Sequence, residues 1–122
     1  MQRENRIVAS AREVVPIEEI GRLDASSSVF TAAERAYALS KSDPERRLAA
    51  RLAAKRAALL LLGEELDEGD VEILPSRGGP PQLSFSSRAR ARVRALGAER
   101  ALVSLTHGRT HAAASVLLLA VD

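Results

Sequence analysis

The sequence predicts a mixed α/β domain built around one long helix. Residues 43–63 have the pattern of a capped helix, because Asp43 can cap its first turn, Pro44 suits its first position and Gly63 can end it. Segments with strand patterns stand on both sides of this helix along the chain. With 122 residues, of which 46% are hydrophobic, the chain is long enough for one core, so we expect a single domain over residues 1–122.

The long helix carries one charge in an unexpected place. At 100° per residue, its apolar stripe contains Leu48, Leu52, Leu59 and Leu62. Arg56 falls inside this stripe, whereas Arg47 and Arg51 lie on the polar side of the helix. A buried charge costs several kcal/mol unless it is paired. We therefore expect Arg56 to meet a carboxylate or an anionic ligand.

Composition excludes several classes of function. The chain has no Cys, which rules out disulfides, thiolate metal sites and thiol catalysis. A net charge of +2 with only 2% aromatic residues does not suit nucleic acid, so we expect no nucleic-acid partner. No apolar run approaches about 20 residues and the first residues lack a signal-peptide core, so we expect a cytoplasmic protein without a membrane partner. Abundant Ala and Arg suggest a bacterial source.

The chain before the long helix has the pattern of a strand followed by two short helices. Residues 6–15 alternate as a strand does, with Glu13 on the same small, apolar face as Ile7. A short helix is expected over 17–23, after the proline that ends the strand. Thr31 has Glu34 three residues later, a capping-box pattern that starts a helix to about residue 40.

The chain after the long helix has the pattern of several strands and one more helix. The acidic run 64–70 indicates a solvated loop, and the turn at 77–81 joins two of the strands into a hairpin. Residues 87–96 are typical of a helix, and its arginines spread around the surface, which indicates solvation. The expected strands are 71–74, 82–86, 101–106 and 112–121.

The chain resembles a known family almost from end to end, the holo-acyl-carrier-protein synthases, which are short, trimeric 4'-phosphopantetheinyl transferases. The segments that carry the resemblance are Phe30-Thr31 with Glu34, residues 50–55, and residues 103–107 followed by 112–114; residues 70–73, the turn 79–81 and Gly97 support it more weakly. The resemblance implies a 4'-phosphopantetheinyl transferase fold, in which the long helix packs on a small, mainly antiparallel sheet. It also implies a homotrimer with clefts between subunits that hold coenzyme A.

The sequence departs from this family at positions that matter for its chemistry. Family members hold Mg²⁺ with an Asp on the first strand and a Glu directly after the helix Lys, because this hard cation prefers carboxylate oxygen. Those two positions are Glu13 and Arg56 here, and a guanidinium has no lone pair to give a metal. A Lys that the family uses for phosphate contact and proton transfer is Leu60. We therefore expect a degenerate metal site without Mg²⁺.

The surface that binds the carrier protein also differs. Family members bind the acidic acyl carrier protein with arginines on the short helix after the first strand. The matching helix here offers Glu18 and Glu19, and only Arg22 is nearby. The acyl carrier protein remains a possible partner, but its docking arginines are missing.

Glu13 and Arg56 are each a charge on an otherwise apolar surface, and the resemblance places them close enough to share one metal. We expect the two side chains to pair. One interpretation is a structural ion pair where Mg²⁺ used to be. Another makes Glu13 a general acid or base whose pKa is set by Arg56 and by burial. A third leaves both side chains exposed.

Other candidates would contact a ligand. His107 falls on the coenzyme-side motif of the family and is the reserve candidate for a general acid, whereas His111 has a supporting or packing role. Two histidines without a third ligand do not indicate a metal site. The residues expected to hold phosphates or other parts of the ligand, unless they are simply solvated, are Arg51, Lys55, Arg77, Pro81 and Thr106.

Three classes of function follow from this sequence. The one we favour is a repurposed enzyme of secondary metabolism, which uses the intersubunit cleft for metal-free acid/base chemistry. Its reaction would be the cyclisation, dehydration or isomerisation of a small-molecule substrate, an acyl or polyketide-like intermediate, with no cofactor required and coenzyme A possible. The alternatives are an active 4'-phosphopantetheinyl transferase and a noncatalytic ligand-binding or scaffold protein.

Overall fold

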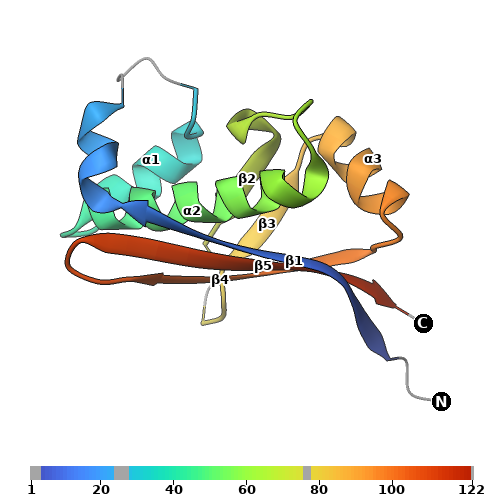
Figure 1. Ribbon diagram of the computed structural model, residues 1–122. Helices are drawn as coiled ribbons and strands as arrows, with labels where there is room; N and C mark the ends of the chain where they lie inside the picture. The colour runs from blue at the N-terminus through green and yellow to red at the C-terminus, as the bar shows by residue number, and fades with distance from the viewer. Residues whose placement is uncertain (1–3, 24–27, 76–77, 122) are drawn as a thin grey trace.

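The computed structural model describes residues 4–23, 28–75 and 78–121 (Figure 1). Its elements, in chain order, are β1 (Asn5–Pro16), the 3₁₀ helix η1 (Ile17–Arg22), α1 (Ala32–Leu39), α2 (Pro44–Leu62), the 3₁₀ helix η2 (Glu68–Asp70), β2 (Val71–Leu74), β3 (Gln82–Phe85), α3 (Ser87–Ala95), β4 (Arg100–His107) and β5 (His111–Val121). The mixed α/β class and the long helix are confirmed. Arg77, a candidate ligand contact, lies outside the described residues.

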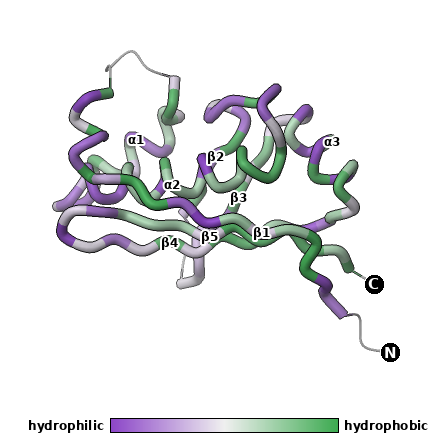
Figure 2. The backbone as a smooth tube through the Cα atoms, in the orientation of Figure 1, coloured by the Kyte–Doolittle hydropathy of each residue, from purple (hydrophilic) through white to green (hydrophobic). Residues whose placement is uncertain are grey.

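Two antiparallel sheets form the β part of the fold. β5 is the central strand of a three-stranded sheet of order β1-β5-β4, and β2 and β3 form a separate hairpin. The helix α2 lies along one face of the larger sheet, with η1 and α1 toward one end and α3 toward the other (Figure 1). β5 is hydrophobic over most of its length, whereas α3 is mainly hydrophilic (Figure 2).

The register of β1 against β5 shifts between Ile7 and Ala9. Such a shift reverses the face to which the following side chains point. Ile7 is therefore 60% exposed and does not share the face of Glu13, as the simple alternation predicted. Beyond the shift the alternation holds: Val15 is fully buried toward α2 and Glu13 is half-buried.

Both ends of α2 form where the sequence predicts them, but with different capping contacts. Asp43 is the N-cap residue, yet its carboxylate accepts a hydrogen bond of 3.0 Å from Arg47 Nε instead of from the backbone amides. Gly63 has a φ of 106°, a conformation that L side chains rarely adopt, and its N–H donates to the carbonyl of Leu59. The stop at Gly63 is thus confirmed as a backbone requirement.

The face of α2 that packs on the sheet is lined mainly by alanine, which lets the helix approach the strands closely. Leu52 and Leu62 of the predicted stripe are buried, while Leu48 and Leu59 are partly buried against the same core. Arg51, predicted on the polar side, is only 3% exposed, which corrects that expectation. The hydrophobic periodicity of α2 predicts only one buried face. More of its surface is buried because α1 and the β2–β3 hairpin also pack against it.

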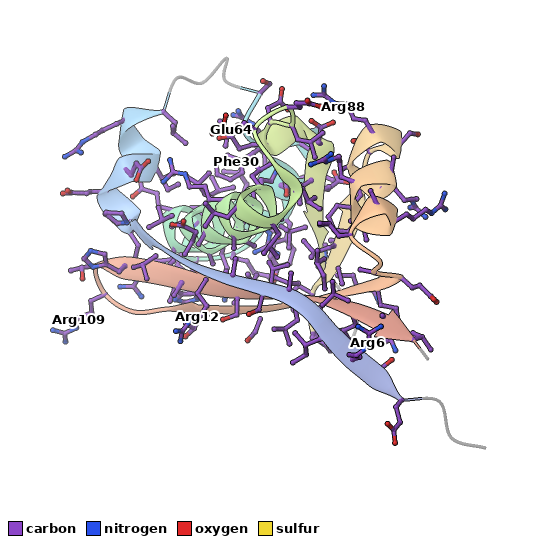
Figure 3. All side chains as sticks on the ribbon, turned by 45° about the vertical axis from the view of Figure 1, so that its right-hand side comes forward. Arg6, Arg12, Phe30, Glu64, Arg88 and Arg109 are labelled. Atoms are coloured by element: carbon purple, nitrogen blue, oxygen red, sulfur yellow. The ribbon has the colours of Figure 1, made fainter. Side chains whose placement is uncertain are left out.

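The acidic segment after α2 is not a simple solvated loop. Its residue Asp70 is buried and accepts hydrogen bonds from Arg88 Nη2 at 2.6 Å and from Ser86 Oγ at 2.7 Å. Figure 3 shows Arg88 extending from α3 toward this segment. Arg92 is exposed, but its Nε donates to the carbonyl of Leu62 at 3.0 Å. These two arginines of α3 stay exposed, as the sequence indicated, and also connect α3 to neighbouring elements.

Within the described ranges, no helix is both long enough and apolar enough to cross a membrane.

Candidate functional site

A cavity of about 400 Å³ opens between the N-terminal half of α2, the end of β4 and the β2–β3 connection. Its lining residues are Tyr37, Arg47, Ala50, Arg51, Pro75, Gly79, Pro81, Leu105, Thr106 and His107. Four of the residues predicted from the sequence to contact a ligand are therefore brought together here: Arg51, Pro81, Thr106 and His107. Tyr37 and Arg47 were not predicted as ligand contacts.

Arg51 is the strongest chemical feature of this cavity. Its guanidinium carbon lies 4.2 Å from the centre of the Tyr37 ring, and one of its Nη atoms donates to the carbonyl of Arg47 at 3.4 Å. Its Nε is buried and has no hydrogen-bond partner in the described part of the chain. Burial lowers the pKa of Arg51, while the neighbouring Tyr37 partly opposes this effect. A buried charged donor without an acceptor costs free energy, so an anion in the cavity would stabilise it.

His107 forms part of the same cavity wall. Its Nε2 lies 4.0 Å from a carboxylate oxygen of Asp43, the residue that precedes α2. His111, by contrast, lies outside this cavity: it is exposed, and its Nδ1 is 2.8 Å from the hydroxyl of Thr110. The two histidines of the β4–β5 turn thus have different surroundings.

Lys55 lies in the core and not on a ligand-facing surface. Its ammonium group is 2.5 Å from Glu34 Oε1 and donates to the carbonyls of Val29, at 2.8 Å, and Glu68, at 3.3 Å. Both side chains of the Lys55–Glu34 pair are 0% exposed. Three acceptors can occupy all three ammonium protons. The expected phosphate contact by Lys55 therefore has no support in this arrangement.

Glu34 has a larger role than the sequence indicated. The predicted capping box with Thr31 is present, and the second carboxylate oxygen of Glu34 accepts from the backbone N–H of Ile73 at 2.8 Å. One carboxylate thus joins α1, α2 and β2. The capping-box pattern located Glu34 but gave no sign of its partner Lys55.

Arg56 has a carboxylate partner, as its position in the apolar stripe required, but the partner is not Glu13. Its guanidinium forms an ion pair and hydrogen bond with Glu19 of η1, and both side chains are about one-third exposed. The hydrogen bond from Arg56 lowers the pKa of Glu19, and the same bond raises the pKa of Arg56. The predicted Glu13–Arg56 pair is thus replaced by a Glu19–Arg56 pair.

Glu13 stays close to this pair without joining it. The hydrogen bond that Arg56 donates to Glu19 is the largest cause of the raised pKa of Arg56, followed among the favourable causes by the charges of Glu19, Glu68 and Glu13. Within the described residues, the carboxylate of Glu13 makes no hydrogen bond or ion pair. The role of Glu13 in proton transfer therefore stays a prediction.

The Mg²⁺ that the resemblance implies does not fit these residues. Its ligands would come from positions 13 and 56, but Arg56 offers only N–H donors and already holds Glu19. Among the described residues, no three of the types His, Asp and Glu converge on a point where a metal could bind. The donor set at this place suits an anion or a carboxylate better than a cation.

Comparison with known proteins identifies what the chain is similar to. No family model matches it. It is 40% identical over 115 residues to the holo-acyl-carrier-protein synthase of Moorella thermoacetica, an alignment that covers 85% of this chain and 90% of that protein. The crystal structure of the holo-acyl-carrier-protein synthase from Neisseria meningitidis superposes with a TM-score of 0.78 at 20% identity, covering 93% of this chain and 98% of that one. The Helicobacter pylori synthase, solved in complex with coenzyme A, gives a TM-score of 0.74 at 19% identity and covers 90% and 99%.

Proposed function

The chain belongs to the holo-acyl-carrier-protein synthase family, and we propose that it binds a coenzyme A-type ligand but has lost Mg²⁺-dependent phosphopantetheinyl transfer. The proposed binding of a coenzyme A-type ligand rests on Arg51, a buried cation with an unpartnered Nε whose residue lines a cavity. The proposed loss of Mg²⁺-dependent transfer rests on the Arg56–Glu19 ion pair at the position where the metal is expected.

Coenzyme A suits the cavity because its phosphates are strong acceptors for guanidinium groups. Arg51 and Arg47 both line the cavity, and His107 adds a third nitrogen donor. A volume of about 400 Å³ lies within the usual range for small-molecule sites. A relative of the same fold, the synthase of Helicobacter pylori, is known in complex with coenzyme A.

The proposed site needs more than one subunit. Glu13, Glu19 and Arg56 do not line the Arg51 cavity, so a single chain holds two separate groups of candidate residues. A threefold assembly would bring the cavity of one chain beside the Glu13 and Arg56 of its neighbour. Val14 and Leu102, on the sheet face turned away from α2, are 59% and 44% exposed and support an interface on that face.

The chemistry that this cleft could perform is proton transfer without a metal. Glu13 would take a proton from the carbon beside an acyl carbonyl, and N–H groups of Arg56 would stabilise the enolate oxygen that forms. Return of the proton at another carbon completes an isomerisation, with no net change in charge. Attack of the enolate carbon on a second carbonyl of the same molecule would instead close a ring, and proton transfer to the new alkoxide balances that step.

An active phosphopantetheinyl transferase is the second candidate, and one observation favours it. The alignment with the Moorella thermoacetica synthase covers 90% of that protein at 40% identity. Identity at this level often accompanies a shared reaction. The substitution at position 56 is the observation that opposes it.

The test combines a binding measurement and a transfer assay on the purified protein. We expect calorimetry to detect coenzyme A binding, and Arg51→Ala to weaken it by about tenfold or more, which corresponds to about 1.4 kcal/mol. Arg94→Ala, at an exposed position on α3, is the matched control and should bind as the wild type does. Mass spectrometry of an apo acyl carrier protein incubated with coenzyme A and Mg²⁺ should show no transfer. Transfer at ordinary enzyme rates would establish the second candidate instead.

A further inference from the structure

A second cavity lies between α3, β3 and the start of β4, at the end of the sheet where α3 packs (Figure 1). Its volume is about 420 Å³. Three of the residues that line it are arginines, namely Arg90 and Arg94 of α3 and Arg100 of β4. The remaining lining residues, apart from Glu99, are apolar: Leu83, Phe85, Val93, Ala98 and Ala101. We call this cavity the basic groove.

The positive charges of the basic groove have no counter-ion in the described part of the chain. The side chains of Arg90, Arg94 and Arg100 form no hydrogen bond or ion pair there. Glu99 lines the same groove, yet it forms no ion pair with them. Arg90 and Arg94 are four residues apart on one helix, so their like charges lie on the same side and repel each other. An anion bound between them would offset this repulsion.

The other two arginines of α3 have partners within the fold. Arg88 donates to a carboxylate and Arg92 to a backbone carbonyl of neighbouring segments. Arg94 lies in the last turn of α3, where a cation stabilises the helix dipole, but Arg90 lies outside that turn. The helix dipole therefore does not explain why Arg90 and Arg100 stand beside this groove.

An apolar cavity of about 450 Å³ continues the basic groove along the space between β3 and β4. The two cavities meet at Leu83 and Ala101, which line both of them. From there the lining follows β4 to Ser104 and the chain before β3 back to Pro80, and it contains no charged residue. The two cavities together thus have a positively charged end and an uncharged, mainly apolar end.

We propose that the basic groove and the apolar cavity together bind a single-chain amphipathic anion, such as a fatty acid or an alkyl phosphate. Guanidinium groups bind carboxylate and phosphate oxygens through strong, charge-assisted hydrogen bonds. The alkyl chain would lie along Leu83 and Ala101, where each methylene group removed from water strengthens binding. The volumes of the two cavities lie within the usual range for small-molecule sites. A compact anion would leave the apolar cavity unused, and an uncharged chain would leave the arginines without a counter-ion.

This site goes beyond the proposed function, because the arginines of the basic groove do not line the Arg51 cavity. The apolar cavity reaches the Arg51 cavity only at its far end, where Pro81 lines both. Leu102 also lines the apolar cavity and lies on the sheet face where we propose subunit contact, so a neighbour would cover the alkyl chain. The binding measurements therefore use the intact protein as purified.

Calorimetry with hexanoate, octanoate and decanoate tests both ends of the site, at concentrations below micelle formation. We expect one decanoate to bind per chain. Binding should weaken about tenfold for each two methylene groups removed, since one buried methylene strengthens binding about three- to fourfold. Inorganic phosphate, which has no chain, should bind too weakly to measure. Decyl phosphate distinguishes the two sources of the anion: tighter binding than decanoate indicates a phosphate head group, and weaker binding indicates a carboxylate.

Substitutions separate the charged end of the site from its apolar end. Arg90→Ala combined with Arg94→Ala should weaken decanoate binding at least tenfold and leave coenzyme A binding unchanged. Arg22→Ala combined with Arg109→Ala removes two exposed arginines away from α3 and is the matched control; Figure 3 shows Arg109 at the opposite end of the sheet. This control should bind decanoate as the wild type does. Leu83→Gln should bring the affinities for hexanoate and decanoate closer together, and circular dichroism checks that each variant is folded.

Three results would overturn the inference. The first is a wild type that binds neither decanoate nor decyl phosphate saturably. The second is equal decanoate affinity of the wild type and the variant with both Arg90→Ala and Arg94→Ala, which would place the ligand on another apolar surface. The third is equal affinity for hexanoate and decanoate, since the chain would then not enter the apolar cavity. Arg51→Ala should change none of these measurements, so a failure here is distinguishable from a failure of the proposed coenzyme A site.

Discussion

At the scale of single residues, the Lys55–Glu34 pair determines how the core is joined. Both side chains are fully buried, and Glu34 also accepts from the backbone of Thr31 and Ile73. Ions of this kind are stable in the core only when every polar group has a partner. Removal of one partner leaves a buried charge, which costs far more than the pair itself contributes.

We predict that Glu34→Ala destabilises the protein by about 3–5 kcal/mol, since it leaves the Lys55 ammonium without its counter-ion. Urea denaturation followed by circular dichroism measures this. Glu18→Ala, which removes an exposed carboxylate from an ion pair with Arg22, is the matched control and should change the stability by less than about 1 kcal/mol. Equal effects of the two substitutions would contradict the role given to the buried pair.

At the scale of elements, Asp70 joins the segment after α2 to the helix α3. Its carboxylate accepts from Arg88 Nε and Nη2 and from Ser86 Oγ, and it also accepts from the backbone N–H of Asp67. Hydrogen bonds donated by Arg88, above all, lower the pKa of Asp70 well below its usual value. Four hydrogen bonds to one carboxylate explain why this acidic segment is ordered.

The lowered pKa makes part of the stability depend on pH. A carboxyl whose folded pKa is below its unfolded pKa stabilises the protein above the unfolded value of about 3.9 and loses that contribution as the pH falls through the folded value. We predict that Asp70→Asn lowers the free energy of unfolding by about 2 kcal/mol at neutral pH. The difference from the wild type should shrink steadily below about pH 4.

Urea titrations at a series of pH values measure this difference. The variant Asp67→Asn is the matched control, because its side chain is more exposed and lies 3.9 Å from Arg88. A difference for Asp70→Asn that stayed constant from neutral to strongly acidic pH would show that its charge contributes nothing.

At the scale of the whole molecule, α2 covers only one face of the three-stranded sheet (Figure 1). The other face carries Val14 and Leu102 at high exposure, with small residues such as Ser104 and Ser115 between them in the register. A face of small and apolar side chains can pack closely against neighbouring subunits around a threefold axis. The same assembly would bring the Arg51 cavity to the Glu13 and Arg56 of a neighbour.

We predict that the protein is a homotrimer at micromolar concentration, because Glu13 and Arg56 do not line the Arg51 cavity of their own chain and the proposed site joins the two groups across an interface. Light scattering coupled to gel filtration measures the mass directly. Leu102→Glu, which places a charge on the uncovered sheet face, should dissociate the assembly and reduce coenzyme A affinity together. Leu39→Glu, at an exposed position of α1, should change neither. A monomeric wild type would contradict the prediction.

The order of the elements could be predicted from the sequence because each is specified locally. The capping box at Thr31 depends on neighbours within a few residues, and so do Pro44 and Gly63 at the ends of the long helix. The same is true of the alternating pattern of the strands. The need of Arg56 for a negative partner could also be predicted, since it follows from one charge on an apolar stripe. Family membership depended on the same local motifs.

The tertiary structure alone decided which charges meet. Arg56 and Glu19 are 37 positions apart, and η1 presents Glu19 to α2, whereas Glu13 lies on β1 and makes no ion pair with Arg56. The burial of Arg51 and Lys55 likewise depends on α1, η2 and the hairpin, which cover sides of α2 that periodicity assigns to solvent. Ion pairs form according to distances of a few ångströms between elements that pack together. Such distances depend on how the elements are placed in space, which a local pattern does not encode.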